Sequence, residues 1–252
     1  MNIILDVTIV SSILYVIFIY LKNSQNHENL SIAKKLAFII GIVFFAIANI
    51  SIIRSYGNQF FSVFTMQQTL LYFVVPPLIF TGLNDQLLKP LYSNKWVKPI
   101  LNRMSKPTLA IIGFNLIFVL QFIPIIFNFI YGNSFLQFLM MLILLPLAFL
   151  MWWPVISPAT KFQTLQPFAK IIYVIGLAVI MTPLVAFFVI STTVLYAPFI
   201  EFHSESIVVL DQQTAGVTMK MAQIIVYSAV IGHAFVEAKR LDDLQTEKDH
   251  FL

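Results

Sequence analysis

Seven apolar stretches dominate this chain and leave little room for a water-soluble fold. A helix rises 1.5 Å per residue, so about 20 apolar residues cross the ~30 Å hydrocarbon core of a bilayer. Only 10% of the 252 residues are charged, whereas about 25% is typical of soluble domains. The pattern predicts an all-α integral membrane protein, a single polytopic domain over residues 1–252 with a seven-transmembrane-helix bundle. The predicted spans are 2–21, 34–53, 60–82, 107–130, 135–157, 168–192 and 213–236.

The basic residues between these stretches predict the orientation. Thirteen lysines and arginines lie on one side, in or beside the loops 22–33, 83–106 and 158–167 and in the tail 237–252. On the other side, only Arg54 lies outside a span. Because cytoplasmic loops carry an excess of Lys and Arg, we expect the N-terminus outside and the C-terminus inside. The net charge of +4 then reflects membrane topology, and no nucleic-acid partner is expected.

Two absences narrow the chemistry. The chain contains no cysteine, which excludes disulfides and thiolate metal sites. It also lacks the common nucleophile, phosphate-binding and zinc-protease motifs, so we do not expect an enzyme. In the loop 196–212, Glu201 and Glu205 lie close to His203. We favour a solvated acidic loop that packs over the mouth of the bundle over a metal site at these residues.

The span 60–82 is polar in its first half. Thr65, Gln68, Thr69 and Tyr72 recur at i, i+3, i+4 and i+7, so they share one helix face. An unsatisfied polar group in lipid costs several kcal/mol, and this face should therefore meet protein or a hydrated cavity. Pro76-Pro77 follows and interrupts the backbone hydrogen bonds, which predicts a kink in the second half of the span.

The predicted orientation places polar residues from several spans at a similar depth in the outer half. We predict that they form one polar chamber open to the outside. Lys220 is the least expected of them, because a charge near a helix centre costs about 2.5–3.5 kcal/mol on insertion scales. Asp6 is the natural partner, and a structural pair is favoured over an ion relay. The predicted chamber comprises Asp6, Thr65, Gln68, Thr69, Gln121, Lys220 and Gln223.

Two further side-chain types bear on cofactors and on the membrane boundary. Met66, Met219 and Met221 carry thioethers, which can bind Cu(I), but methionine is more often a core residue that fills gaps. Trp152-Trp153 stands at the predicted cytoplasmic end of the fifth span, where tryptophan commonly anchors a helix at the interface. No cofactor is expected from the residues alone.

Short motifs occur in a recognisable order over residues 57–236. Thr65-Met66-Gln67-Gln68-Thr69-Leu70-Leu71 is followed by Pro76-Pro77-Leu78 and Gly82, and later by Phe122-Ile123-Pro124 and Trp152-Trp153-Pro154-Val155. Leu195-Tyr196 then precedes Asp211-Gln212-Gln213-x-x-Gly216. These motifs resemble the H-M-x-Q-H-x-L…P-P-L…G, H-L-P, W-W-P-V and L-Y…D-Q-Q-x-x-G elements of the CtaG-type cytochrome c oxidase assembly factors.

The resemblance implies a fold and a role, but this sequence differs from the family at the residues expected to bind the metal. The family is associated with the maturation of haem–copper oxidases, by delivery of copper that span-three and span-four histidines are expected to bind. Thr65, Thr69 and Phe122 stand at those positions here, and neither a hydroxyl nor a phenyl ring replaces imidazole. Copper is therefore possible but disfavoured. Four matching residues are expected to shape the chamber mouth or a partner surface: Asp211, Gln212, Gln213 and Gly216.

The leading hypothesis is a divergent, non-enzymatic CtaG-like factor in the bacterial plasma membrane. It would assist the assembly or stability of a haem–copper terminal oxidase, with membrane lipid as one partner and oxidase subunits as the candidate protein partners. The alternative is a small transporter or binding protein for an anionic or polar solute. That protein would use an outward-facing chamber around Lys220.

Overall fold

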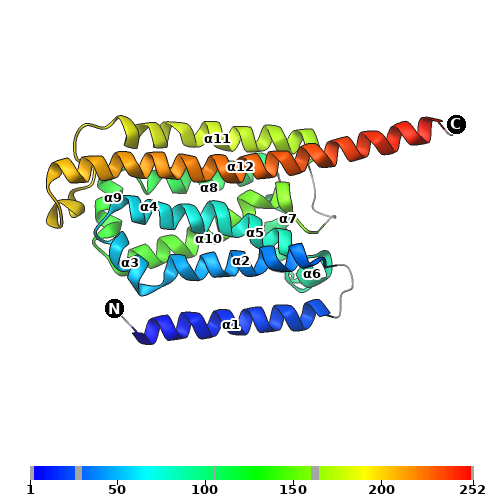
Figure 1. Cartoon of the computed structure of the whole chain (residues 1–252), viewed down its shortest axis with the longest axis horizontal. Helices are drawn as coiled ribbons and strands as arrows, with labels where there is room; N and C mark the ends of the chain where they lie inside the picture. The colour runs from blue at the N-terminus through cyan, green and yellow to red at the C-terminus, as the bar shows by residue number, and fades with distance from the viewer. Residues whose placement is uncertain (1–2, 26–29, 105, 160–164, 251–252) are drawn as a thin grey trace.

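The computed structural model describes residues 3–25, 30–104, 106–159 and 165–250, and within them the fold is helical without a strand (Figure 1). Proline begins three of the helices, at Pro107, Pro124 and Pro167, where its missing N–H costs nothing. The helices are α1 (Ile3–Gln25), α2 (Ile32–Asn49), α3 (Ser51–Gly57), α4 (Phe61–Thr69), the π-helical η1 (Leu70–Val74), α5 (Val75–Gly82), α6 (Asp85–Ser93), α7 (Val97–Met104), α8 (Pro107–Leu120), α9 (Pro124–Tyr131), α10 (Ser134–Ile156), α11 (Pro167–Ile190), the 3₁₀ turn η3 (Ala197–Glu201) and α12 (Glu205–His250).

The number of membrane crossings is partly settled. Six segments in the described ranges are long and apolar enough to span a membrane, or up to seven if the bent pair Val97–Arg103 and Pro107–Leu120 is one span. The predicted span 107–130 is divided into α8 and α9, with a turn at Gln121 before Pro124. The chain is thus a multi-pass membrane protein, and both the count of seven and the orientation remain predictions.

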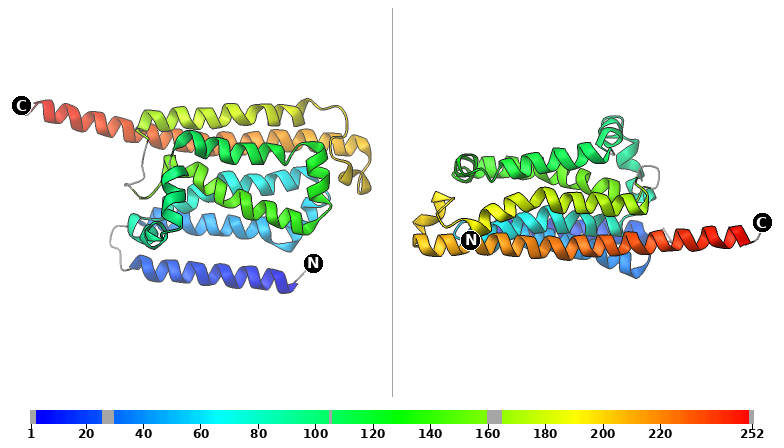
Figure 2. Two further views of the ribbon diagram at one scale, coloured as in Figure 1. Left: turned by 180° about the vertical axis from the view of Figure 1, so that it is seen from behind. Right: turned by 90° about the horizontal axis from the view of Figure 1, so that it is seen from above.

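The segment Phe61–Gly82 lies at the centre of the bundle. It combines α4, η1 and α5 in one span that is 56% buried, against 11% for the span in α1. α12 packs on α4, α2 packs on α5, and α10 packs on both η1 and α5. Figures 1 and 2 show α1 at one edge, beside α2, and the α11–α12 pair at the opposite edge. The polar stretch found in the sequence therefore belongs to the most enclosed helix.

The two prolines of this central segment are accommodated by a π-helical turn. Pro76 has no N–H to offer the carbonyl of Tyr72, its expected partner four residues earlier. The indole Nε1 of Trp152 donates to that carbonyl instead, at 3.1 Å.

Trp152 and Trp153 are 0% and 2% exposed. The prediction that they anchor the helix at the membrane interface is therefore wrong, because they pack inside the bundle.

Two other sequence expectations need correction. The predicted loop 196–212 ends early, since α12 already begins at Glu205 and continues through the predicted tail to His250. Glu205 lies in the first turn of this helix, where a carboxylate interacts favourably with the helix dipole. The predicted cytoplasmic loop 83–106 contains two short helices, α6 and α7. Lys161, within the predicted loop 158–167, lies outside the described residues.

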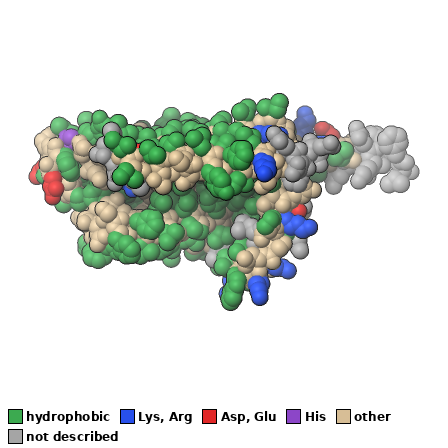
Figure 3. Space-filling model, turned by 90° about the horizontal axis from the view of Figure 1, so that it is seen from below, with side chains coloured by type: hydrophobic (Ala, Val, Ile, Leu, Met, Phe, Trp, Pro, Cys, Tyr) green, Lys and Arg blue, Asp and Glu red, His purple; other side chains and the backbone are tan. Residues whose placement is uncertain are grey.

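Charged residues are distributed unevenly between the two ends of the molecule. On the face shown in Figure 3, most Lys and Arg side chains lie toward the end from which α12 projects, with some acidic side chains among them, and further acidic side chains lie at the opposite end. That asymmetry agrees with the predicted orientation. We refer to the end that carries Arg54, the turn between α9 and α10 and residues 191–204 as the predicted outer end.

Candidate functional site

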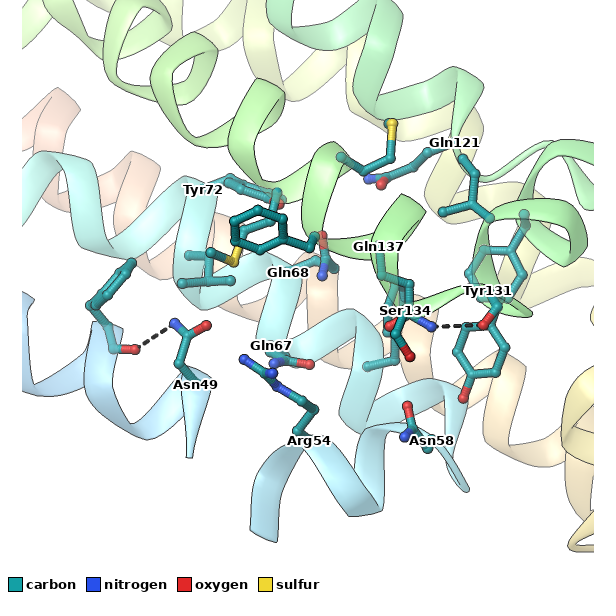
Figure 4. A pocket seen from close by; sticks show the side chains of 18 of the residues that line it. Asn49, Arg54, Asn58, Gln67, Gln68, Tyr72, Gln121, Tyr131, Ser134 and Gln137 are labelled. Carbon is teal, nitrogen blue, oxygen red and sulfur yellow. Dashed lines mark hydrogen bonds between the residues drawn. The ribbon is translucent and has the colours of Figure 1, made fainter. Parts of the chain in front are cut away.

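A recess of about 410 Å³ lies at the predicted outer end, between α2, α3, α4, η1, α9 and α10 (Figure 4). We call it the outer recess. Neither Asp nor Glu is among its lining residues, and Arg54 is its one charged side chain. The polar side chains that line it are Asn49, Arg54, Asn58, Gln67, Gln68, Tyr72, Gln121, Tyr131, Ser134 and Gln137.

The break between α2 and α3 positions the cationic side of the recess. α2 ends at Asn49 and α3 begins at Ser51, so Arg54 projects from a short separate helix. Asp6 of α1 holds the start of that helix, because its Oδ1 accepts from both the N–H and the hydroxyl of Ser51 at 2.7 Å. The predicted Asp6–Lys220 pair is therefore wrong. Asp6 caps α3 and does not line the recess.

Hydrogen bonds to main-chain carbonyls fix much of the recess wall. Gln67 donates to the carbonyl of Ala48, and Asn49 donates to that of Phe45 at 2.8 Å. On the other side, the hydroxyl of Tyr131 donates to the Gly57 carbonyl at 3.1 Å, and Gln137 donates to the Tyr131 carbonyl at 2.7 Å. The wall is thus pre-organised by contacts between α2, α3, α4, α9 and α10.

Two amides in the recess are uncommitted. The side chain of Gln68 makes no hydrogen bond to a described residue. Gln121 is only 6% exposed, and its Nε2 has no partner among the described residues. A buried donor without a partner costs about 1–3 kcal/mol. Among the predicted chamber residues, these two do line one recess, together with Tyr72 of the polar helix face.

The other predicted chamber residues lie elsewhere. Thr65 and Thr69 are fully buried, and their hydroxyls donate to the carbonyls of Phe61 and Thr65 on their own helix. Lys220 lies at the seam between α12 and α11, where Nζ donates to Thr182 Oγ1 at 3.0 Å and to the Ala178 carbonyl at 3.4 Å. The prediction that Lys220 shares a chamber with the polar face of span three is therefore wrong.

Gln223 is also separate from the recess. It is 0% exposed on α12, and neither atom of its amide has a partner within the described part of the chain. Tyr227, one turn further along α12, packs its ring against Phe73 and Trp152, with centroids 6.4 and 6.0 Å apart. Gln223 therefore does not join the predicted chamber.

Aromatic rings fill the space where the sequence predicts a hydrated mouth. Phe61 stacks on Tyr196 with centroids 4.3 Å apart and meets Phe188 edge to face at 5.2 Å. Phe127 lies 4.4 Å from Tyr196, and Phe122 meets Phe188 at 5.4 Å. The region between α4, α9, α11 and η3 is thus packed and apolar. This cluster sets the boundary of the outer recess on that side.

The Asp211-Gln212-Gln213-x-x-Gly216 motif makes contacts between elements. Asp211 accepts from the N–H of Ser62 at 3.1 Å and from the Ser62 hydroxyl, so it caps the start of α4. Asp211 does not cap its own helix, because α12 begins six residues earlier. Gln213 donates to the Ser191 carbonyl at 3.0 Å. These contacts tie α12 to α4 and to the end of α11.

Gln212 and Gly216 complete this set of contacts. Gln212 is 0% exposed; its Oε1 accepts from the N–H groups of Leu195 and Tyr196 at 2.8 and 3.3 Å, and its Nε2 donates to the Thr193 carbonyl at 3.1 Å. At Gly216, a Cβ would lie 2.7 Å from a methyl group of Val189. The four motif residues therefore hold the predicted outer end together, and none of them lines the outer recess.

The potential metal ligands do not form a cluster. No group of three or more His, Cys, Asp or Glu residues is arranged for a metal within the described ranges. Met219 is fully buried, whereas Met66 and Met221 are 38% and 55% exposed. His203 packs its ring on Phe60, with centroids 4.4 Å apart.

Several recess residues were not predicted from the sequence. Asn58, Tyr131 and Ser134 lie at the ends of spans, where polar side chains are ordinary. The signal that could have identified the recess is Arg54, the one basic residue outside a span on the predicted outer side. A single basic residue on that side is unusual, and the structure shows that Arg54 lines the recess.

The comparisons with known proteins agree with the motifs. The family model described as cytochrome c oxidase caa3 assembly factor (Caa3_CtaG) matches residues 13–240. No curated protein and no solved structure matches the chain. The family match covers the central helix, all lining residues of the outer recess except Ile9, and the contacts made by Asp211 to Gly216. The chain therefore belongs to the cytochrome c oxidase caa3 assembly factor family, as its motifs indicate.

Proposed function

We propose that this protein assists the assembly or stability of a haem–copper terminal oxidase in the bacterial plasma membrane, through protein contacts and without catalysis. The family match over residues 13–240 is the observation that carries this proposal. The family's name refers to assembly of a caa3-type cytochrome c oxidase. Terminal oxidase subunits are accordingly the proposed protein partners, and lipid surrounds the apolar helices.

We further propose that the protein acts without a histidine copper site. Thr65 and Thr69 stand where the family resemblance places histidines, and both hydroxyls donate to carbonyls of their own helix. Phe122 occupies the third such position and is packed among aromatic rings. Neutral hydroxyls and a phenyl ring are poor ligands for copper. These contacts support the proposal that the chain is a member of the family without the histidine ligands for copper.

A solute-binding or transport function is the second candidate. The outer recess favours it, because this cavity is lined by hydrogen-bond donors and contains Arg54. Lys220, the residue around which the sequence suggested such a site, is already bound to Thr182 and does not line the recess. Any solute site would therefore be centred on Arg54.

Deletion of the gene tests the oxidase role. We expect the haem–copper oxidase activity of the membranes, and the amount of assembled oxidase seen by haem spectroscopy, to fall to a small fraction of wild type. Added copper should not restore either quantity, because the proposed role is not copper supply. Re-expression of the wild-type chain is the control and should restore both. Unchanged oxidase content would refute the assembly role, and rescue by copper alone would refute the copper-independent mechanism.

A further inference from the structure

Among the side-chain atoms of the outer recess that have no partner in the described residues, hydrogen-bond donors outnumber acceptors. Arg54 contributes five N–H groups. Its guanidinium has no ion-pair partner, since the one ion pair in residues 3–25, 30–104, 106–159 and 165–250 joins Lys170 to Glu237. The carboxylate of Asp6 is hydrogen-bonded by Ser51. Among the described residues, no acidic side chain lines the recess. Asp6 interacts electrostatically with Arg54 but forms no ion pair with it, so the guanidinium keeps its hydrogen-bond donors for a ligand.

The uncommitted donors reach the recess from three separate elements. Arg54 comes from α3, Gln68 from α4, and Gln121 from the turn that ends α8 (Figure 4). Gln121 is more than nine-tenths buried and its Nε2 has no partner. A buried polar group is normally satisfied by protein, water or ligand. A ligand that carries acceptor oxygens would satisfy it.

Apolar side chains line the rest of the recess. Phe45, Leu71, Phe138 and Met141 are among them. The volume of about 410 Å³ lies within the usual size of small-molecule sites, which combine apolar walls with a few convergent polar groups. The recess therefore suits a ligand with an anionic head and an apolar portion.

We propose that the outer recess binds the phosphate or carboxylate of an anionic ligand, with Arg54 as the charge partner and Gln68 and Gln121 as neutral donors. This site is independent of the oxidase role. An anionic phospholipid of the predicted outer leaflet and a soluble organic anion or phosphate both carry the required oxygens. Guanidinium pairs with either in a bidentate geometry.

Thermal unfolding of the purified full chain tests this site and distinguishes the two sources. A ligand that binds only the folded state raises the midpoint as its concentration exceeds Kd. One arm adds inorganic phosphate or citrate to protein in neutral detergent, at constant ionic strength. The other compares nanodiscs of phosphatidylcholine with nanodiscs that also contain phosphatidylglycerol. If the unfolding midpoint rises in phosphatidylglycerol nanodiscs but not with phosphate or citrate, the ligand is a lipid headgroup. If the midpoint rises with phosphate or citrate, the ligand is a soluble anion.

Variants separate specific binding from general salt effects, which matter because phosphate also stabilises proteins by exclusion from their surface. Arg54→Gln should weaken the apparent affinity by about tenfold or more, as expected for loss of a charge-assisted hydrogen bond. Gln121→Leu should weaken the response while the midpoint without ligand stays level or rises. Lys220→Gln is the matched control, because Lys220 is a basic residue outside the recess, and it should keep the full response.

Two results would overturn the proposal. One is a wild-type midpoint that neither anion nor phosphatidylglycerol raises. The other is a rise of the same size in Arg54→Gln, which would show a general effect of salt or lipid. Oxidase content in the deletion strain is measured separately, so failure here leaves the assembly role unaffected.

Discussion

Replacement of Gly82 by alanine is expected to destabilise the protein by about 3 kcal/mol or more, at the upper end of the range for overpacked cores. A Cβ at this position would lie 2.7 Å from the carbonyl oxygen of Lys34 and 2.8 Å from the backbone nitrogen of Phe38. It would also collide with the Cβ of Phe38. None of these atoms belongs to a flexible side-chain end, so α2 and α5 would have to separate.

The effect should extend to α1. The carbonyl of Gly82 accepts a hydrogen bond from the hydroxyl of Tyr20 at 2.6 Å, and Tyr20 in turn stacks on Phe38 with centroids 3.8 Å apart. A shift of α5 away from α2 would disturb both contacts. Three helices therefore depend on the absence of a side chain at one residue.

The midpoint of thermal unfolding in detergent measures this effect, with Gly232→Ala as the control. Gly232 also lies in a helix, and a Cβ there would meet nothing within 4 Å. Alanine should stabilise that position by up to about 1 kcal/mol through its higher helix propensity. Equal midpoints for the Gly82 and Gly232 variants would show that α2 and α5 are not in close contact.

Gln212→Leu is expected to cost a similar amount, again about 3 kcal/mol or more, through unpaired polar groups and not through a clash. The substitution removes the partners of three main-chain groups, at Thr193, Leu195 and Tyr196. A buried group left unpaired costs about 1–3 kcal/mol. That cost applies fully at Tyr196, which is buried, and is smaller at Leu195 and Thr193, which water can reach. The connection between α11 and α12 should lose its fixed position.

The packing of Tyr196 should be disturbed by the same substitution. Its hydroxyl donates to the carbonyl of Phe122 at 2.8 Å and its ring stacks on Phe61, so the aromatic cluster depends on it. Limited proteolysis within residues 191–204, together with the thermal midpoint, measures the loss. Thr214→Val is the control, since Thr214 is exposed and bonds only within its own helix. Protection from protease as in wild type would contradict the role assigned to Gln212.

Hydropathy predicted the membrane fold and motif order predicted the family. These two predictions succeeded because hydropathy and short motifs can be recognised from local sequence. The spans 60–82, 135–157 and 168–192 agree with the observed segments Phe61–Gly82, Ser134–Ile156 and Pro167–Ile190 within about two residues, the usual uncertainty of helix ends. The start of α12 was predicted as a loop because Glu201, Glu205 and Asp211 interrupt the apolar pattern there, and hydropathy does not distinguish a solvated helix from a loop.

The site was predicted less well, because depth in the membrane does not specify which helix face meets which neighbour. Gln68 and Lys220 were placed at similar depths, yet one faces the outer recess and the other lies against α11. A charge in an apolar span suggested a hydrated chamber, but Thr182 and the Ala178 carbonyl supply its partners. Such contacts between helices are set by packing, which single-span patterns do not reveal.

Co-purification from native membranes tests the central claim most directly. The full chain, expressed at its natural level with an affinity tag, would be solubilised in mild detergent and its bound proteins quantified by mass spectrometry. We predict that subunits of a haem–copper terminal oxidase are enriched over an untagged control and over a tagged, unrelated multi-pass protein. Recovery of the chain intact but without oxidase subunits above both controls, including after cross-linking in the intact membrane, would contradict a role in oxidase assembly through protein contacts.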